Sequence, residues 1–309
     1  MAVTNFLVSS LPAYVQDNKD ILIKNFALVG RDTRSRIGLQ TGVKLDAHLN
    51  YFELNSVLQD GSACGFDPLD EMTLSQRTIH APAIKDDGEI CPETLLGKYA
   101  EYLVRVNATE NECPFEEYIL KTLTDVINKK IEKLIWQGDT TSSSTDLKWI
   151  DGILKQVGAD TTIPAGQKVT ITGTSASAYA DILAVYMAAP EEALDRGLLI
   201  FVSPATYRAF VQNLVAQNLY HYAGPQDAFP GEFILPGSDA VVVRTPGLSG
   251  VTSIVATFGE NLVYGCDAEG DNEDIDLWWS QDKRKFCYQV KWNSGIAYRF
   301  PAMMAVGTV

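Results

Sequence analysis

One segment constrains the fold more than any other: residues 113–139, CPFEEYILKTLTDVINKKIEKLIWQGD, carry a single unbroken amphipathic pattern. Pro114 suits the first helical position, where a missing N–H costs nothing, and Gly138 offers a left-handed end. Apolar residues recur at helical spacing at Phe115, Ile119, Leu123, Val126, Ile127, Ile131, Leu134 and Ile135. The pattern predicts one helix over residues 114–137, about 36 Å long at about 1.5 Å per residue, which is long for a globular domain.

Composition and charge narrow the class of protein. The 309 residues are 46% hydrophobic and 21% charged, as in a globular chain with an ordinary core. A net charge of −14 disfavours phosphate backbones and anionic membranes as partners. Five cysteines without a CxxC pair indicate a reducing compartment, and no run reaches the length of a membrane span. We expect a cytoplasmic protein, or part of an assembly made there.

The first third of the chain predicts extended structure. Residues 1–60 show no sustained period and are interpreted as an arm with one or two short elements. The next segment predicts a strand, a turn at KDDGE (residues 85–89) and a returning strand, and Pro82 and Pro92 place these strands at an edge or in a projecting hairpin. Arm and hairpin bury too little apolar area against their own core, so we expect neighbouring copies to order them.

The remainder predicts a compact α/β unit followed by strands. Strands and helices alternate over residues 160–265, and the chain from Ala240 onward is almost entirely strand. Apolar and polar residues alternate over residues 285–292, which predicts a half-buried strand in a hairpin that turns near SQDKR (residues 280–284).

No pattern of residues indicates catalysis. His48, His80 and His221 lie far apart without metal-ligand spacing, and neither a GxSxG elbow nor a phosphate-binding glycine motif occurs. The acidic residues 267–276 are interpreted as a solvated turn, with a divalent-ion or interface role as the alternative. Arg31, Arg34 and Arg36 predict a solvated or subunit-contacting loop, with phosphate contact as the alternative. We therefore expect no enzyme activity, metal or cofactor.

Several stretches resemble one known family. The run FEEYILKTLTDVINKKIEKLIWQGD, preceded by LSQRTIHAPAIKDDGEICPETL, is similar to the major capsid proteins of tailed bacteriophages with the Hong Kong 97-type fold, especially those of phages of Bacteroidetes-like hosts. The similarity continues through FVSPATYRAFVQNL, ILPGSDAVVVRTPGLSG and ENLVYGCDAEGDNEDIDLWWSQDKRKFCYQVKWNSGIAYRFP. It covers roughly residues 62–301 and implies an α+β fold.

The resemblance implies a division of labour along the chain. It assigns an N-terminal arm to residues 1–60, the extended loop and its flank to 61–110, a peripheral domain with the long spine helix to 111–159, an axial domain to 160–265, and a peripheral-domain β-hairpin with the C-terminus to 266–309. The residues expected to pack the spine helix are Phe115, Ile119, Leu123, Ile127, Ile131 and Trp136. Those expected to contact neighbouring subunits are Arg77, Lys85, Asp86, Asp87 and Glu89.

The function that the resemblance implies is structural. The chain would assemble with itself, as pentamers and hexamers, into an icosahedral shell around the double-stranded DNA of a tailed phage. Portal, scaffold and head–tail connector proteins would be further partners, and the acidic chain would touch packaged DNA weakly and nonspecifically. Its place would be the virion capsid, assembled in the host bacterial cytoplasm, without a membrane.

Three other functions fit parts of these observations. An encapsulin-like bacterial compartment would share the fold but enclose cargo enzymes instead of DNA. A soluble α/β enzyme would form a small oligomer and contain a deep pocket with perturbed titratable groups. A decoration protein would coat a shell that another chain builds.

Overall fold

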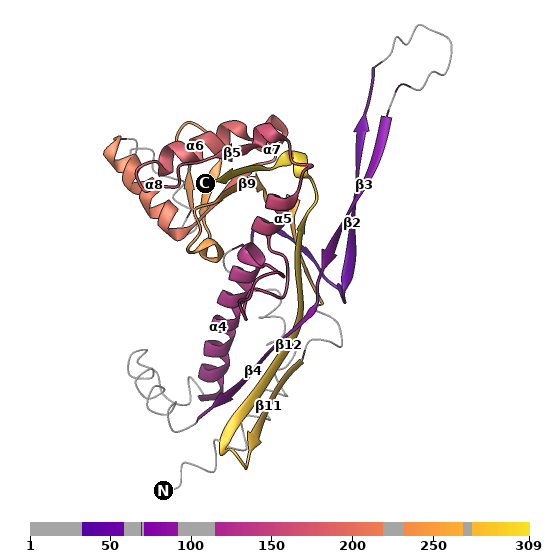
Figure 1. The fold of residues 1–309 in the computed structure, drawn as a ribbon, viewed down its shortest axis with the longest axis vertical. Helices are drawn as coiled ribbons and strands as arrows, with labels where there is room; N and C mark the ends of the chain where they lie inside the picture. The colour runs from indigo at the N-terminus through magenta and orange to yellow at the C-terminus, as the bar shows by residue number, and fades with distance from the viewer. Residues whose placement is uncertain (1–32, 59–68, 70, 92–114, 219–231, 268–273) are drawn as a thin grey trace.

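The computed structural model describes residues 33–58, 69, 71–91, 115–218, 232–267 and 274–309. Figure 1 shows an elongated molecule with three parts: a compact helix-covered unit, a long helix beside a long sheet, and a two-stranded hairpin that projects away from both. This mixture of helices and sheets confirms the α+β class. Among the described residues, no helix has the length and apolar character needed to span a membrane.

The elements are as follows. The helices are α4 (Phe115–Gln137), α5 (Ile153–Ala159), α6 (Ala178–Ala188), α7 (Glu191–Asp195) and α8 (Pro204–Ala216), with 3₁₀ turns η1 (Ala165–Gln167), η2 (Pro246–Leu248), η3 (Gly259–Asn261) and η4 (Pro301–Met303). The strands are β1 (Gly38–Gln40), β2 (Asp46–Asn55), β3 (Glu71–His80), β4 (Ala83–Ile90), β5 (Lys168–Thr170), β6 (Leu198–Val202), β7 (Glu232–Ile234), β8 (Val241–Arg244), β9 (Ile254–Phe258), β10 (Leu262–Cys266), β11 (Asp274–Ser280), β12 (Lys285–Tyr298) and β13 (Ala305–Thr308).

Helix α4 forms where the amphipathic pattern predicts it. Its 23 residues make a rod of about 34 Å. Its buried face joins one hydrophobic cluster with side chains of β12, α5 and η2. Val126, which the apolar pattern places on the same stripe, is instead 46% exposed, because it lies at the margin of that face.

Gly138 follows the end of α4 because backbone atoms of other residues approach it too closely to admit a side chain. The left-handed conformation expected at Gly138 is wrong. The left-handed glycines of the described residues do not include Gly138. A Cβ atom there would lie 2.5 Å from the carbonyl oxygen of Ile150 and 2.6 Å from that of Leu134. The next turn of chain therefore packs directly on the helix end, and Gly152 donates its backbone N–H to the carbonyl of Gly138.

A five-stranded sheet lies beside α4. Its order is β1-β10-β12-β11, and β4 also pairs with β12. Strands β11 and β12 form the predicted C-terminal hairpin, with Asp274 opposite Lys291 and Ser280 opposite Lys285. Phe286, Val290 and Trp292 are buried on the face toward α4, as their alternation predicts.

A six-stranded sheet, β5-β13-β9-β6-β8-β7, forms the core of the compact unit. Helices α6, α7 and α8 cover it (Figure 1), and α6 approaches β13 so closely that a Cβ atom on Gly307 would lie 2.7 Å from a methyl group of Val185. Strand β13 lies between β5 and β9. The boundary predicted at residue 266 therefore does not follow strand pairing, because residues 305–308 return to the unit predicted for residues 160–265.

The projecting hairpin differs from the predicted one. Strand β3 pairs with β2 over its whole length, from Asp46 opposite His80 to Asn55 opposite Glu71. The expected turn at residues 85–89 is wrong: these residues lie inside the extended strand β4, which pairs with β12. Pairing with β12 buries Ile84 and satisfies the backbone of the KDDGE sequence, and this long-range contact overrides a local turn signal. The hairpin thus begins within the predicted arm.

Arg34 and Arg36 do not lie in the solvated loop that the sequence predicts. Arg34 is buried, and its guanidinium donates to the side-chain oxygen of Asn128 on α4 at 2.6 Å. Arg36 forms an ion pair with Glu232 at 2.5 Å. Both arginines therefore attach residues 33–37 to the body of the chain, whereas Arg31 lies outside the described residues.

Candidate interaction surfaces

The far half of the β2–β3 hairpin carries exposed apolar side chains. Phe52 is 65% exposed, Met72 65% and Leu74 70%. Phe52 lies directly opposite Leu74 in the β2–β3 register, and Met72 is two residues from Leu74. Because side chains alternate across a strand, all three share one face of the ribbon. We call these three residues the distal patch. In Figure 1 this half of the hairpin stands clear of the other described elements.

The base of the hairpin is packed through the opposite face. Leu49 and Ile79 are buried there in a cluster with Val263 of β10 and Ala297 of β12. Apolar character therefore changes from one face of the ribbon to the other between Tyr51 and Phe52. The face of the ribbon that carries Leu49 and Ile79 packs on the rest of the molecule. The face that carries the distal patch has no partner among the described residues.

Ile79 occupies a socket made by two facing glycines. Gly265 of β10 and Gly295 of β12 lie directly opposite each other in register. A Cβ atom on either glycine would lie 2.9 Å from the same methyl group of Ile79, closer than real Cβ contacts. The missing side chains thus admit Ile79, which is fully buried, and bring β3 against the five-stranded sheet.

Arg77, two residues further out on the same face, makes a polar attachment. Its Nη2 donates to Asp160 Oδ2 at 2.6 Å and to Thr162 Oγ1 at 2.9 Å. The guanidinium lies 4.4 Å from the centre of the Tyr298 ring, and the Tyr298 hydroxyl donates to the same Asp160 oxygen at 2.5 Å. Three segments, β3, the end of α5 and β12, therefore meet at one carboxylate.

Electrostatics keep Asp160 and Arg77 charged and Tyr298 protonated. Burial alone raises the pKa of Asp160, but hydrogen bonds from Thr162, Tyr298 and Arg77 outweigh it and hold that pKa well below its usual range. Burial and the hydrogen bond to Asp160 raise the pKa of Tyr298, so its hydroxyl remains a donor. Burial lowers the pKa of Arg77, yet the bond to Asp160 leaves a net increase.

The other residues predicted to contact neighbours lie on β4. Glu89 forms ion pairs with Lys283 and Lys285, and the hydrogen bond from Lys283 is the main cause of its lowered pKa. The pKa of Asp87 is lowered by hydrogen bonds from Lys85 and Gln289. The half-buried Asp86 alternates to the other face of β4. Arg77, by contrast, lies on the hairpin. The residues predicted together as subunit contacts therefore belong to two different surfaces.

Most residues predicted to pack the spine helix are buried. Leu123, Ile127 and Ile131 lie in the main core, and the side chains of Phe115 and Ile119 lie outside the described residues. Trp136 is fully buried, donates its indole N–H to Thr33 Oγ1 at 2.8 Å, and lies 5.1 Å from the ring of Phe201 in β6. Trp136 thus joins the end of α4 to the six-stranded sheet.

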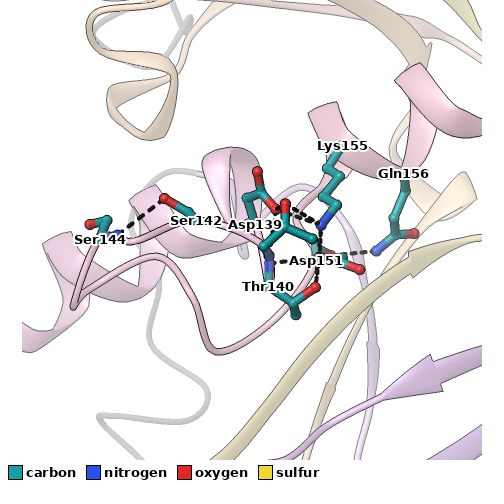
Figure 2. A network of polar contacts seen from close by, with 8 residues as sticks. Asp139, Thr140, Ser142, Ser144, Asp151, Lys155 and Gln156 are labelled. Atoms are coloured by element: carbon teal, nitrogen blue, oxygen red, sulfur yellow. Dashed lines mark hydrogen bonds and ion pairs between the residues drawn. The ribbon is translucent and has the colours of Figure 1, made fainter.

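A polar network holds the chain between α4 and α5 (Figure 2). Lys155 of α5 lies 2.5 Å from Asp139 Oδ1 and 3.0 Å from Asp151 Oδ1. Thr140 donates to Asp151 through its backbone N–H and its hydroxyl. Hydrogen bonds from Lys155 and Thr141 lower the pKa of Asp139 to about 2. Gln156 extends the network to β12 by donating to the carbonyl oxygen of Ile296 at 2.8 Å.

The described residues hold no group of three or more side chains suited to a metal ion. His48 lies within hydrogen-bond distance of Thr78, and His80 pairs with Asp46. His221 lies outside the described residues. A cavity of about 270 Å³ lies between the starts of α6 and α8. Its carboxylate, Asp181, already accepts hydrogen bonds from the backbone N–H groups of Thr172 and Gly173 and from the Ser177 hydroxyl.

Sequence reasoning missed the distal patch, Ile79 and its glycine socket. The segment LNYFELN contains apolar residues at both odd and even positions, so its pattern favours neither face. A change of apolar face within one strand is the signal that was present. Gly265 and Gly295 lie 30 positions apart, and only strand pairing brings them together.

The architecture is shared with proteins that form shells. A chain of the satellite phage P4 procapsid, solved with its size determination protein, is 14% identical, with a TM-score of 0.58 over 95% of this chain and 98% of its own. A capsid chain of the native GTA particle is 11% identical, with a TM-score of 0.57 over 90% and 91%. A chain of the SrpI encapsulin complex from Synechococcus elongatus is 12% identical, with a TM-score of 0.50 over 88% and 84%.

The fold therefore defines the class: this is a chain with the fold of capsid shell proteins. More narrowly, it is the Hong Kong 97-type fold that the resemblance in the sequence implies, and this prediction is confirmed. No protein-family model and no curated protein sequence matches the chain.

Proposed function

We propose that this chain is a major capsid protein that assembles with copies of itself into a closed icosahedral shell. One observation carries the proposal: on a capsid fold, the hairpin presents the distal patch on a face with no partner among the described residues. Large exposed apolar side chains on a protruding ribbon favour association. A second copy is the proposed partner, since closed symmetric assemblies reuse one contact many times.

The energy of each contact is modest. Burying the remaining exposed area of Phe52, Met72 and Leu74 would contribute about 1–2 kcal/mol per side chain. Such a contact alone does not hold two free subunits together, because association costs at least several kcal/mol of lost translational and rotational freedom. Repetition around a closed shell raises the effective concentration of every remaining contact and makes the whole stable.

The enclosed material is proposed to be the double-stranded DNA of a tailed phage. The chain works without catalysis, in a virion capsid assembled in the host bacterial cytoplasm, with portal, scaffold and connector proteins as further partners. The resemblance to tailed-phage capsid proteins supports this choice. A net charge of −14 fits a wall that touches DNA weakly.

The alternative is an encapsulin-like compartment shell, which the similarity to the SrpI encapsulin chain favours. The two functions differ in what the shell encloses. Shells isolated from the native source and treated with nuclease contain protected DNA in the first case and a cargo protein in the second.

The assembly proposal is tested by replacing the distal patch. The triple variant F52S/M72S/L74S keeps every backbone hydrogen bond of the hairpin, so we expect a folded subunit that forms no shells. The matched control is Met187→Ser, which makes the same kind of change at a side chain that is 74% exposed on α6. Electron microscopy and sedimentation compare shells formed by the wild type, the triple variant and the control.

The outcomes separate clearly. Shells from the wild type and the control, with free subunits from the triple variant, support the proposal. A wild type that never assembles, alone or with its neighbouring genes, would overturn it. Undiminished shells from the triple variant would remove the distal patch from the contact and leave the proposal without the observation that carries it.

A further inference from the structure

We propose that Arg77 is a positioning residue that sets the direction of the β2–β3 hairpin before any neighbour binds. This inference rests on the proposed function, because the direction of the hairpin matters for where the distal patch meets a second copy. It assigns to the interior of one subunit a property that neighbours were expected to impose. The cluster of Arg77, Asp160, Thr162 and Tyr298 is called the hairpin clamp.

The socket for Ile79 and the neighbouring Leu49 hold only the base of the hairpin. Apolar contacts confined to one end of a ribbon fix its position better than its angle. Arg77 lies two residues outward on the same face, about 6–7 Å from Ile79 along the strand. Its bonds to Asp160 and its stacking on Tyr298 supply a second fixed point. Tyr51 on β2 adds an edge contact with Phe300 at 5.1 Å.

The chemistry of the clamp favours a defined geometry. A guanidinium is planar and its donors point in fixed directions, whereas an ammonium is a point charge that accepts many orientations. Here the guanidinium lies over the Tyr298 ring while the same nitrogen reaches Asp160 and Thr162. Asp160 is held in turn by Tyr298, so acceptor and stacking surface belong to one rigid cluster.

Leverage makes the angle important. The distal patch begins about 17 Å beyond Ile79, at five residues and about 3.3 Å per residue. A rotation of roughly 10° at the base moves the patch by about 3 Å, nearly the separation of two carbon atoms in contact. Arg77 touches none of the patch residues, so a change in the clamp alters the direction of the hairpin without altering the surface that it presents.

The test measures direction in the unassembled subunit. Nitroxides on genetically encoded ketone residues at Thr73 in β3 and Glu191 in α7 report the hairpin-to-body distance by double electron–electron resonance. We expect one narrow distance distribution for the wild type and a distribution about twice as wide for Arg77→Ala, because the charge-assisted contacts are lost. Arg77→Lys should broaden it nearly as much, since an ammonium restores the charge but not the planar group that lies over the Tyr298 ring. Arg208→Ala, at an exposed position of α8, is the control and should change nothing.

A second variant protects the test against loss of folding. Tyr298→Phe keeps the ring beneath the guanidinium and removes only the hydroxyl that donates to Asp160, and it should give intermediate broadening. Shells made by the Arg77 variants should then vary in diameter more than wild-type shells under electron microscopy. A merely structural role would lower the melting temperature without widening the distribution.

The proposal is overturned if the wild-type distribution is already broad, or if Arg77→Ala and Tyr298→Phe both leave it narrow. Full rescue by Arg77→Lys would also overturn it, since a point charge would then suffice. The distance measurement needs no shells. A wild type that fails to assemble therefore counts against the proposed function and leaves the result on the clamp standing.

Discussion

At the scale of single residues, the attachment of the hairpin depends on two glycines, Gly265 and Gly295, because a side chain at either position would collide with β3. Gly295 approaches the chain so closely that a Cβ atom would lie 2.4 Å from the carbonyl oxygen of His80. A carbonyl oxygen of a paired strand cannot move aside as the end of a flexible side chain can. The backbone of β3 would have to shift away from β12, and the seat of Ile79 would shift with it.

Gly295→Ala should therefore destabilise the protein by about 1–3 kcal/mol, the usual cost of overpacking. Urea unfolding of the unassembled subunit measures this as a lower midpoint. Gly158→Ala is the matched control, because a Cβ atom there meets nothing within 4 Å and the residue lies in α5. It should raise stability by up to about 1 kcal/mol. Equal behaviour of the two variants would show that the socket is not tight.

At the scale of elements, the polar network in Figure 2 holds α5 against the chain that follows α4. Asp139 lies two residues after Gln137, the last residue of α4, and Lys155 lies in α5, so their contact joins the two helices across the intervening chain. Gln156 connects the same helix to β12. Helix α4, α5 and the long sheet are therefore held together at one end by polar contacts as well as by the buried core.

Acid should weaken this junction. The pKa of Asp139 falls from 3.8 to about 2 in the folded protein, so its contribution is complete above about pH 4 and is lost as the pH falls toward 2. Wild type should melt at a higher temperature than Asp139→Asn at pH 6, and the difference should shrink between pH 4 and pH 2. Asp146→Asn, at an exposed pair with Lys130 at 3.8 Å, is the control and should show little difference at any pH. A constant gap for Asp139→Asn would contradict the assignment.

At the scale of the whole molecule, the two ends of the described chain join its parts. Residues 33–37 attach to α4 through Thr33 and Arg34, and β13 inserts between β5 and β9 of the other unit. The chain leaves the five-stranded sheet after β12, passes through η4 and enters the six-stranded sheet as β13, so one continuous segment contributes strands to both sheets. The long sheet and the six-stranded sheet are therefore tied together by the chain itself.

Removing residues 305–309 should open the six-stranded sheet in its interior. Ala305 and Val306 are buried, and β5 and β9 would lose their shared partner. We expect loss of protection from hydrogen exchange in β5, β9 and α6, while β2, β3 and β11 stay protected. Removing Val309 alone, which is 74% exposed, is the control. Equal protection after both truncations would show that β13 is dispensable.

Local patterns in the sequence predict much of this fold. The long helix, the C-terminal hairpin and the start of α8 at Ser203 all follow from patterns within a few residues. Ser203 caps α8 by accepting the backbone N–H of Thr206, as a serine before a proline predicts. Resemblance to capsid proteins predicted the fold correctly. Such features are predictable because neighbours in sequence generate the forces that produce them.

The tertiary structure decided the features that depend on distant partners. Residues 85–89 carry a turn signal, yet pairing with β12 makes them a strand. Arg34 and Arg36 have the composition of a solvated patch, yet Asn128 and Glu232 bind them within the chain.

The hairpin divides between these two kinds of information. Extended structure in this third of the chain is predicted locally, whereas the pairing of β2 with β3, the socket for Ile79 and the clamp on Arg77 depend on distant partners. The sequence by itself determined the long helix, the C-terminal hairpin and the family that the chain resembles. Only the tertiary structure decided where the hairpin begins, what anchors it and which face remains bare, because burial and strand register are set by partners far away in the chain.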